Sequence, residues 1–177
     1  VRQFVDRFVE AGAVHPLPSH GPFGPDDVTV VMPHWSPDTG RLTAVVPHGL
    51  RTVVVDDASP GWTAPADEDV QVIRRDVNGG PAAARNTGLA SVTTPVVAFV
   101  DTDVVLPVGA ADWLVPLLAH FDDPRVAIVA PRVASLAGPG HLAAYEQRHS
   151  PLDLGDEPAR VAPGSRVSYL PAAVLVC

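Results

Sequence analysis

The stretch VAFVDTDVVLP, Val97 to Pro107, decides the fold because an apolar run ends there in two acidic residues. Most residues from Pro95 to Val100 are β-branched or aromatic, which is typical of a strand buried on both faces. Asp101 and Asp103 therefore follow directly where this strand leaves the sheet. In open α/β sheets ligands bind at the carboxyl ends of the strands. Two like charges this close together also need a cation nearby.

The other apolar runs alternate between two patterns. Besides Pro95–Val100, strands are expected over residues 28–32, 51–55, 70–74 and 126–133. Helices are expected over residues 1–11, 81–90, 110–120 and 140–148. Strands that alternate with helices predict an α/β fold with a mostly parallel sheet and helices on both faces.

A Pro-rich stretch, HPLPSHGPFGPDD from His15 to Asp27, is typical of a linker. The sequence thus predicts the end of a preceding domain over 1–12, a linker over 13–27, and an α/β domain over 28–177 that is incomplete at its C-terminus. Residue 177 directly follows the apolar run AAVLV. We therefore interpret the chain as part of a longer polypeptide.

Composition excludes several classes of protein. The formal net charge is 12 − 20 = −8 with no basic stripe, which argues against nucleic acid as a partner. No apolar run reaches about 18 residues, so no membrane span is expected, and no signal peptide is recognisable. Cys177 is the only cysteine, which excludes an internal disulfide and is compatible with a cytoplasmic location. All twelve basic residues are Arg, which excludes a P-loop lysine or a Schiff base.

Two further motifs follow strands and lie on the expected ligand side of the sheet. VVVDDASP, Val53 to Pro60, places two acids where a carboxylate could bind a base or a ribose hydroxyl; a helix cap or solvated turn is the alternative. NGGPAAARNTGLA, Asn78 to Ala90, opens a helix whose N-terminus favours anions, with Arg85 about one turn further on. An ordinary glycine-started helix with a surface arginine is the alternative there.

The DTD stretch has the spacing of a cation site. Two carboxylates in a turn can face one divalent cation, and Mg²⁺ or Mn²⁺ commonly binds one or two carboxylates together with substrate phosphates. A cap on the following helix is the alternative, because Asp-x-Asp alone is a weak pattern.

In combination and in this order, VVMPHW, VVDDAS, GGPAAARNTG and DTD resemble the motifs of family 2 glycosyltransferases, inverting enzymes with a GT-A fold. The resemblance covers roughly Val28 to Val133. VEAGAVHPLP and the segment from Tyr145 to Cys177 are further similar to the glycosyltransferases of the mycofactocin system, which add glucose to a peptide-derived redox cofactor.

The resemblance implies a role for each motif residue. The donor would be a UDP-sugar, with glucose the expected sugar, and the acceptor would be a small peptide-derived molecule or a glycoside. Mg²⁺ or Mn²⁺ would be the cofactor. Asp101 and Asp103 would hold the metal, with Asp103 the more direct ligand. Trp35 would stack on the uracil or wall it off, and Asp57, with Asp56 beside it, would bond the uracil. Arg85 would lie near the diphosphate and the acidic pair. The expected donor-binding residues are Pro33, Trp35, Asp56, Asp57, Gly80, Arg85, Asp101 and Thr102.

Two departures from the family pattern qualify the resemblance. The segment HWSPDTGRLTAVVPHGL, residues 34–50, leaves room for about two helical turns where the family has a full helix. The family's general base is a carboxylate well downstream of the DxD motif, so it is expected beyond Cys177. No catalytic residue is assigned, and this chain alone is expected to be inactive.

Three alternatives belong to other classes. A phosphorelay receiver domain also has acidic residues after its strands but needs a lysine, which is absent. A nucleotidyltransferase shares the sheet and the metal carboxylates but usually opens with a Gly-rich basic loop, which PHWSPDTGR fits poorly. A non-catalytic donor-binding module stays open, because fold alone does not decide activity.

Overall fold

The computed structural model describes residues 2–36, 42, 46–64, 70–107, 112–136 and 138–177. Contacts between Cα atoms divide the chain into two units. One unit consists of Val1–Leu17 and Ala130–Pro171, and the other consists of Pro18–Val129 and Ala172–Cys177. The domain boundaries expected from the sequence stay a prediction.

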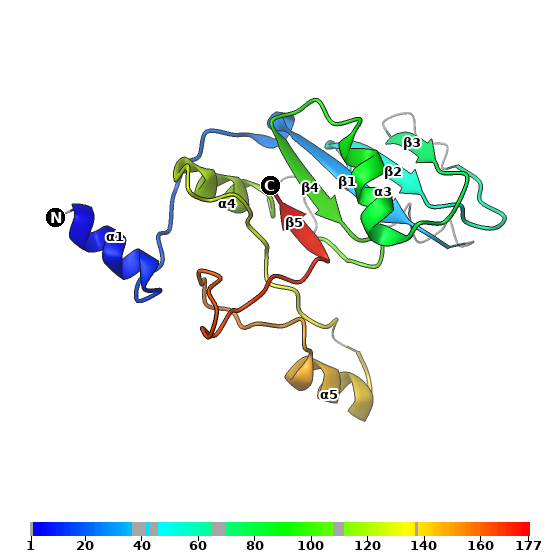
Figure 1. The fold of residues 1–177 in the computed structure, drawn as a ribbon. Helices are drawn as coiled ribbons and strands as arrows, with labels where there is room; N and C mark the ends of the chain where they lie inside the picture. The colour runs from blue at the N-terminus through cyan, green and yellow to red at the C-terminus, as the bar shows by residue number, and fades with distance from the viewer. Residues whose placement is uncertain (1, 37–41, 43–45, 65–69, 108–111, 137) are drawn as a thin grey trace. The chain divides into compact units, whose positions relative to one another are not determined.

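The second unit is built on a five-stranded sheet with the order β3-β2-β1-β4-β5 (Figure 1). Neighbouring strands among the first four are parallel, and β5 runs antiparallel to β4. The strands are β1 Val28–His34, β2 Arg51–Asp56, β3 Val70–Arg74, β4 Val96–Val100 and β5 Val174–Val176. The expected α/β fold with a mostly parallel sheet is therefore confirmed.

The strands are rich in valine because both faces of the sheet are covered. Alternate residues of a strand point to opposite faces. Thus Val30 and Met32 join one buried cluster, which includes Leu114 and Leu118, whereas Val31 joins a second cluster with Ala84. The second cluster lies against helix α3, Gly80–Leu89, which contacts β1 and β2 (Figure 1). The helix expected over 81–90 is confirmed to within one residue at each end.

The helix expected over 110–120 is shorter in the structure. Residues 108–111 lie outside the described residues, and helix α4 covers only Val115–Leu118. A 3-10 helix, η2 at Ala119–Asp122, continues it. Pro116 explains the late start, because a residue without an N–H is tolerated only in the first helical turn.

The prediction of a strand over residues 126–133 was wrong. Only Val129 of this segment pairs, through an isolated bridge to Val176. The place beside β4 is taken by β5, where Val100 pairs with Val174. Periodicity identified an apolar segment but not its competitor for the sheet edge, which lies far along the chain.

The first unit contains helices α1, Arg2–Glu10, and α5, His141–His149, as expected from the sequence. Outside these helices, side chains of this unit organise irregular backbone. Arg132 forms a two-bonded ion pair with Asp153, at 2.7 Å for each bond, and the Tyr169 hydroxyl donates to the Pro151 carbonyl at 2.5 Å.

Two further expectations from the sequence concern the short helix after the first strand and the possibility of a membrane span. The shortened helix expected within residues 34–50 falls largely on residues 37–41 and 43–45, outside the described residues. Within the described part of the chain, no helix combines the length and apolarity that crossing a bilayer requires.

Gly88 fixes how closely α3 approaches the sheet. A Cβ atom there would lie 2.4 Å from Cγ1 of Val31 and 3.0 Å from Cγ2 of Val55. We expect Gly88→Ala to lower the free energy of unfolding by about 1–2 kcal/mol, because overpacking of a buried contact outweighs alanine's better helix propensity. Urea denaturation measures this change.

Gly24→Ala is the matched control, since a Cβ at Gly24 meets nothing within 4 Å and the backbone φ is −112°. We expect its unfolding free energy to differ from the parent by less than about 0.5 kcal/mol. Equal stability of Gly88→Ala and the parent would show that α3 can move away from β1 at little cost.

Candidate functional site

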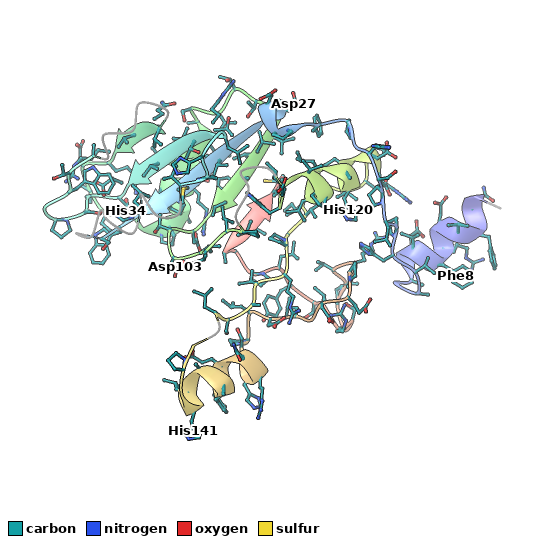
Figure 2. All side chains as sticks on the ribbon, turned by 180° about the vertical axis from the view of Figure 1, so that it is seen from behind. Phe8, Asp27, His34, Asp103, His120 and His141 are labelled. Atoms are coloured by element: carbon teal, nitrogen blue, oxygen red, sulfur yellow. The ribbon has the colours of Figure 1, made fainter. Side chains whose placement is uncertain are left out.

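The candidate site is a cavity of about 410 Å³ at the carboxyl ends of the parallel strands. Figure 2 shows His34 and Asp103 at this end of the sheet, with Asp27, which precedes β1, at the opposite end. Seven residues predicted from the sequence line the cavity: Pro33, Trp35, Asp57, Gly80, Asp101, Thr102 and Asp103.

Asp57 joins the end of β2 to the start of α3. One of its carboxylate oxygens accepts a hydrogen bond from the Gly80 amide at 2.7 Å, and the Gly79 amide lies 3.1 Å from both oxygens. Arg75 forms an ion pair with the same carboxylate. Asp57 is only 2% exposed, so these donors offset the cost of burying its charge.

Asp56, the neighbouring acid, does not line the cavity. It is fully buried, forms an ion pair with Arg74, and accepts a hydrogen bond from the Ser59 amide at 3.1 Å. The register of the sheet pairs Asp56 with Arg74 directly. The structure thus separates the two predicted acids: Asp57 reaches the cavity, and Asp56 holds the turn behind it.

Arg85 does not line the cavity but forms an ion pair with one of the carboxylates that do. It forms an ion pair with Asp101 and donates to the Ala172 carbonyl at 3.2 Å. The Asp101 amide in turn donates to the Ala173 carbonyl at 2.9 Å. Arg85 therefore does not line the cavity as expected for a donor-binding residue; it holds Asp101 against the segment that leads into β5.

Asp101 and Asp103 are the carboxylates that could hold a metal ion. Burial raises the pKa of Asp101 above its ordinary value; the Arg85 guanidinium opposes this rise, and the charge of Asp103 adds to it. No group of three potential metal ligands occurs among the described residues. Two carboxylates facing a cavity nevertheless fit Mg²⁺ or Mn²⁺, which prefer oxygen ligands and commonly take the remainder from substrate phosphates and water.

Sequence reasoning missed some residues that build the site. His34, Ser36 and Asn78 also line the cavity. Arg74 and Arg75 were missed as the partners of the two acids. A signal existed for these two arginines, because two consecutive acids begin at the last residue of β2 and two consecutive arginines begin at the last residue of β3, its neighbour in the sheet.

Several known proteins are similar to the chain. Over 177 residues it is 46% identical to "Pre-mycofactocin glycosyltransferase" of Mycobacterium tuberculosis, strains CDC 1551 / Oshkosh and ATCC 25618 / H37Rv. The alignment covers 96% of this chain but 37% of each relative, so the chain spans little more than a third of their length. "Succinoglycan biosynthesis protein ExoW" of Rhizobium meliloti (strain 1021) is 35% identical over 95 residues, covering 44% of this chain and 30% of that protein.

Among solved structures, the fold resembles that of the mannosyltransferase PcManGT from Pyrobaculum calidifontis, determined in complex with GDP-Man and Mn²⁺. The TM-score is 0.56 and the sequence identity is 23%, over 75% of this chain and 43% of that one. This likeness supports the expected GT-A architecture. Residues 47–163 match the family model described as Glycosyl transferase family 2, and because this match takes in most of the chain, the chain belongs to that family.

Proposed function

We propose that this chain carries the donor site of an inverting glycosyltransferase that transfers a hexose, glucose in particular, from a UDP-sugar to an acceptor. The observation that carries the proposal is one cavity lined by an exposed aromatic ring, the first turn of a helix and three carboxylates, of which Asp101 and Asp103 lie in one turn. An aromatic face suits a nucleotide base, and a carboxylate pair suits a metal diphosphate.

The base would lie between Trp35 and Asp57. Trp35 is 58% exposed although it lines the cavity, so its ring is available for stacking. Asp57 already accepts hydrogen bonds from Gly79, Gly80 and Arg75. A carboxylate has about four acceptor positions, so at most one is left for the N–H of uracil.

The diphosphate would lie toward Asp101 and Asp103. Mg²⁺ or Mn²⁺, when bound, supplies positive charge against the negative charge that develops on the leaving nucleoside diphosphate. Asp103 is exposed and carries no ion pair among the described residues, whereas Asp101 shares its charge with Arg85. Asp103 is therefore the more direct ligand, and Asp101 orients the turn.

The acceptor is proposed from the relatives. Two curated relatives at 46% identity carry the name pre-mycofactocin glycosyltransferase, so we propose the peptide-derived redox cofactor mycofactocin as the acceptor. The single cysteine is in keeping with a reaction in the reducing cytoplasm.

Nucleotide preference tests the base assignment. We expect UDP to bind at least about tenfold more tightly than GDP in the presence of Mn²⁺, because Asp57 has at most one acceptor position left and this position beside Trp35 suits a pyrimidine. Titration calorimetry with UDP, CDP, TDP and GDP measures the four dissociation constants. Tighter binding of GDP would contradict the uracil assignment.

Removal of one carboxylate charge tests the metal assignment. We expect Asp103→Asn to weaken UDP binding in Mn²⁺ by about 10- to 100-fold, because the amide keeps the size but loses the charge that holds the cation. EDTA should weaken UDP binding by the parent to a similar extent, and it should weaken UDP binding by Asp103→Asn hardly any further.

Asp122→Asn is the matched control for this change. Asp122 is exposed in η2, does not line the cavity, and loses the same charge. Its affinity for UDP should equal that of the parent. If Asp103→Asn also binds UDP like the parent, with and without EDTA, the acidic pair serves only to shape the turn.

A further inference from the structure

The turn after β2 is strained and completely buried at both ends. Ala58 adopts a backbone φ of 60°, the left-handed region that alanine rarely occupies. Asp56 and Ser59 flank it and are both fully buried. Such a conformation persists only where surrounding contacts hold it, and strained turns of this kind concentrate at functional sites.

Two contacts hold this turn in place. The Ser59 amide donates to Asp56 at 3.1 Å, and Arg74 forms an ion pair with the same carboxylate. The second nitrogen of the Arg74 guanidinium donates to the Ser59 carbonyl at 3.2 Å. Ser59 is thereby fixed through its amide and its carbonyl, which leaves its hydroxyl group in a defined position.

The Ser59 hydroxyl reaches from this turn to the end of β1. Its oxygen accepts a hydrogen bond from the Ser36 amide at 2.9 Å, across 23 residues of chain. On the other side of Trp35, the His34 ring packs against Trp62, with centroids 4.8 Å apart and the ring planes tilted by 47°, and it donates to the Ser36 carbonyl at 3.2 Å. The backbone on both sides of Trp35 is thus held, while its ring remains exposed at the cavity.

We propose that Ser59 is a positioning residue that holds the Trp35 segment for base stacking, and that Asp56 and Arg74 act through Ser59. This inference rests on the proposed nucleotide site. It gives Asp56 the role of an inner anchor, in place of the direct donor contact expected from the sequence. Ser59 itself does not line the cavity, so its effect on a nucleotide must pass through Trp35.

Ser59→Ala is the most direct test, because it removes the hydroxyl but keeps the Asp56–Arg74 ion pair and both backbone contacts. Ser91→Ala is the matched control. The Ser91 hydroxyl donates to the Gly88 carbonyl at 2.7 Å in the same unit, away from the cavity. Each variant loses one hydroxyl hydrogen bond, so a purely structural role predicts similar effects from both.

The first measurement needs no nucleotide. In the 177-residue chain carrying Trp62→Phe and Trp113→Phe, Trp35 is the only tryptophan. We expect Ser59→Ala to lower the fluorescence anisotropy of Trp35 by allowing faster local motion, and Ser91→Ala to leave it unchanged. Equal Trp35 anisotropy with and without Ser59→Ala in this single-tryptophan chain would overturn the proposal.

The second measurement is a double-mutant cycle on UDP affinity in Mn²⁺, in the chain with all three tryptophans. We expect Ser59→Ala to weaken UDP binding about fivefold, the size of one lost hydrogen bond, and to have less than about a twofold effect when Trp35 is already alanine. An undiminished loss in the Trp35→Ala background would show that Ser59 acts by another route.

The two measurements also separate this inference from the proposed function. If the parent does not bind UDP but Ser59→Ala still lowers the anisotropy, the nucleotide assignment is wrong while the positioning of Trp35 by Ser59 stands. If the parent binds UDP and neither anisotropy nor affinity responds to Ser59→Ala, the positioning role is wrong and the nucleotide site stands.

Discussion

The buried carboxylate of Asp57 is the interaction on which the site depends. Asp57 directly follows β2, accepts hydrogen bonds from the Gly79 and Gly80 amides at the start of α3, and forms an ion pair with Arg75, which directly follows β3. A buried charge is tolerated only with partners of this kind, so the Asp57 carboxylate holds the ends of β2 and β3 and the start of α3 in one arrangement. The N-terminus of α3 is directed at the cavity because its amides donate hydrogen bonds to Asp57, which lines that cavity.

Two acid–arginine ion pairs, with the same separation in sequence, hold different parts of the site at the carboxyl ends of the strands. Asp57 and Arg75 set the wall made by α3, whereas Asp56 and Arg74 set the turn that contacts the Trp35 segment. Parallel β2 and β3 bring their ends side by side, so Asp56 pairs in register with Arg74, and the residues that follow them, Asp57 and Arg75, form the second ion pair. The chain carries a net charge of −8, yet it concentrates two of its twelve arginines where the sheet buries carboxylates.

Much of the fold and most of the site residues could be predicted because both follow from the ends of β-branched runs. The family resemblance singled out Asp57, with Asp56 beside it, for the base, but strand periodicity alone does not fix which of the two acids faces the cavity, since adjacent strand residues point to opposite sides. Asp57 therefore reached the cavity while Asp56 did not. The edge strand was missed for another reason: Val174–Val176 has only three residues, and what makes it a strand is its pairing with β4.

That same short strand explains why the turn that carries Asp101 and Asp103 cannot be a local structure. The Asp101 amide donates a hydrogen bond to the Ala173 carbonyl. Arg85, which forms an ion pair with the Asp101 carboxylate, also donates to the Ala172 carbonyl. These contacts span more than seventy residues of sequence, so they form only after the intervening segment has closed a long loop. The spacing of the two acids is encoded in three consecutive residues, but their orientation depends on the docking of β5. The carboxylate pair and the completed sheet are thus one cooperative feature: a change that loosens β5 would act on the cavity through Asp101 without touching any residue that lines it.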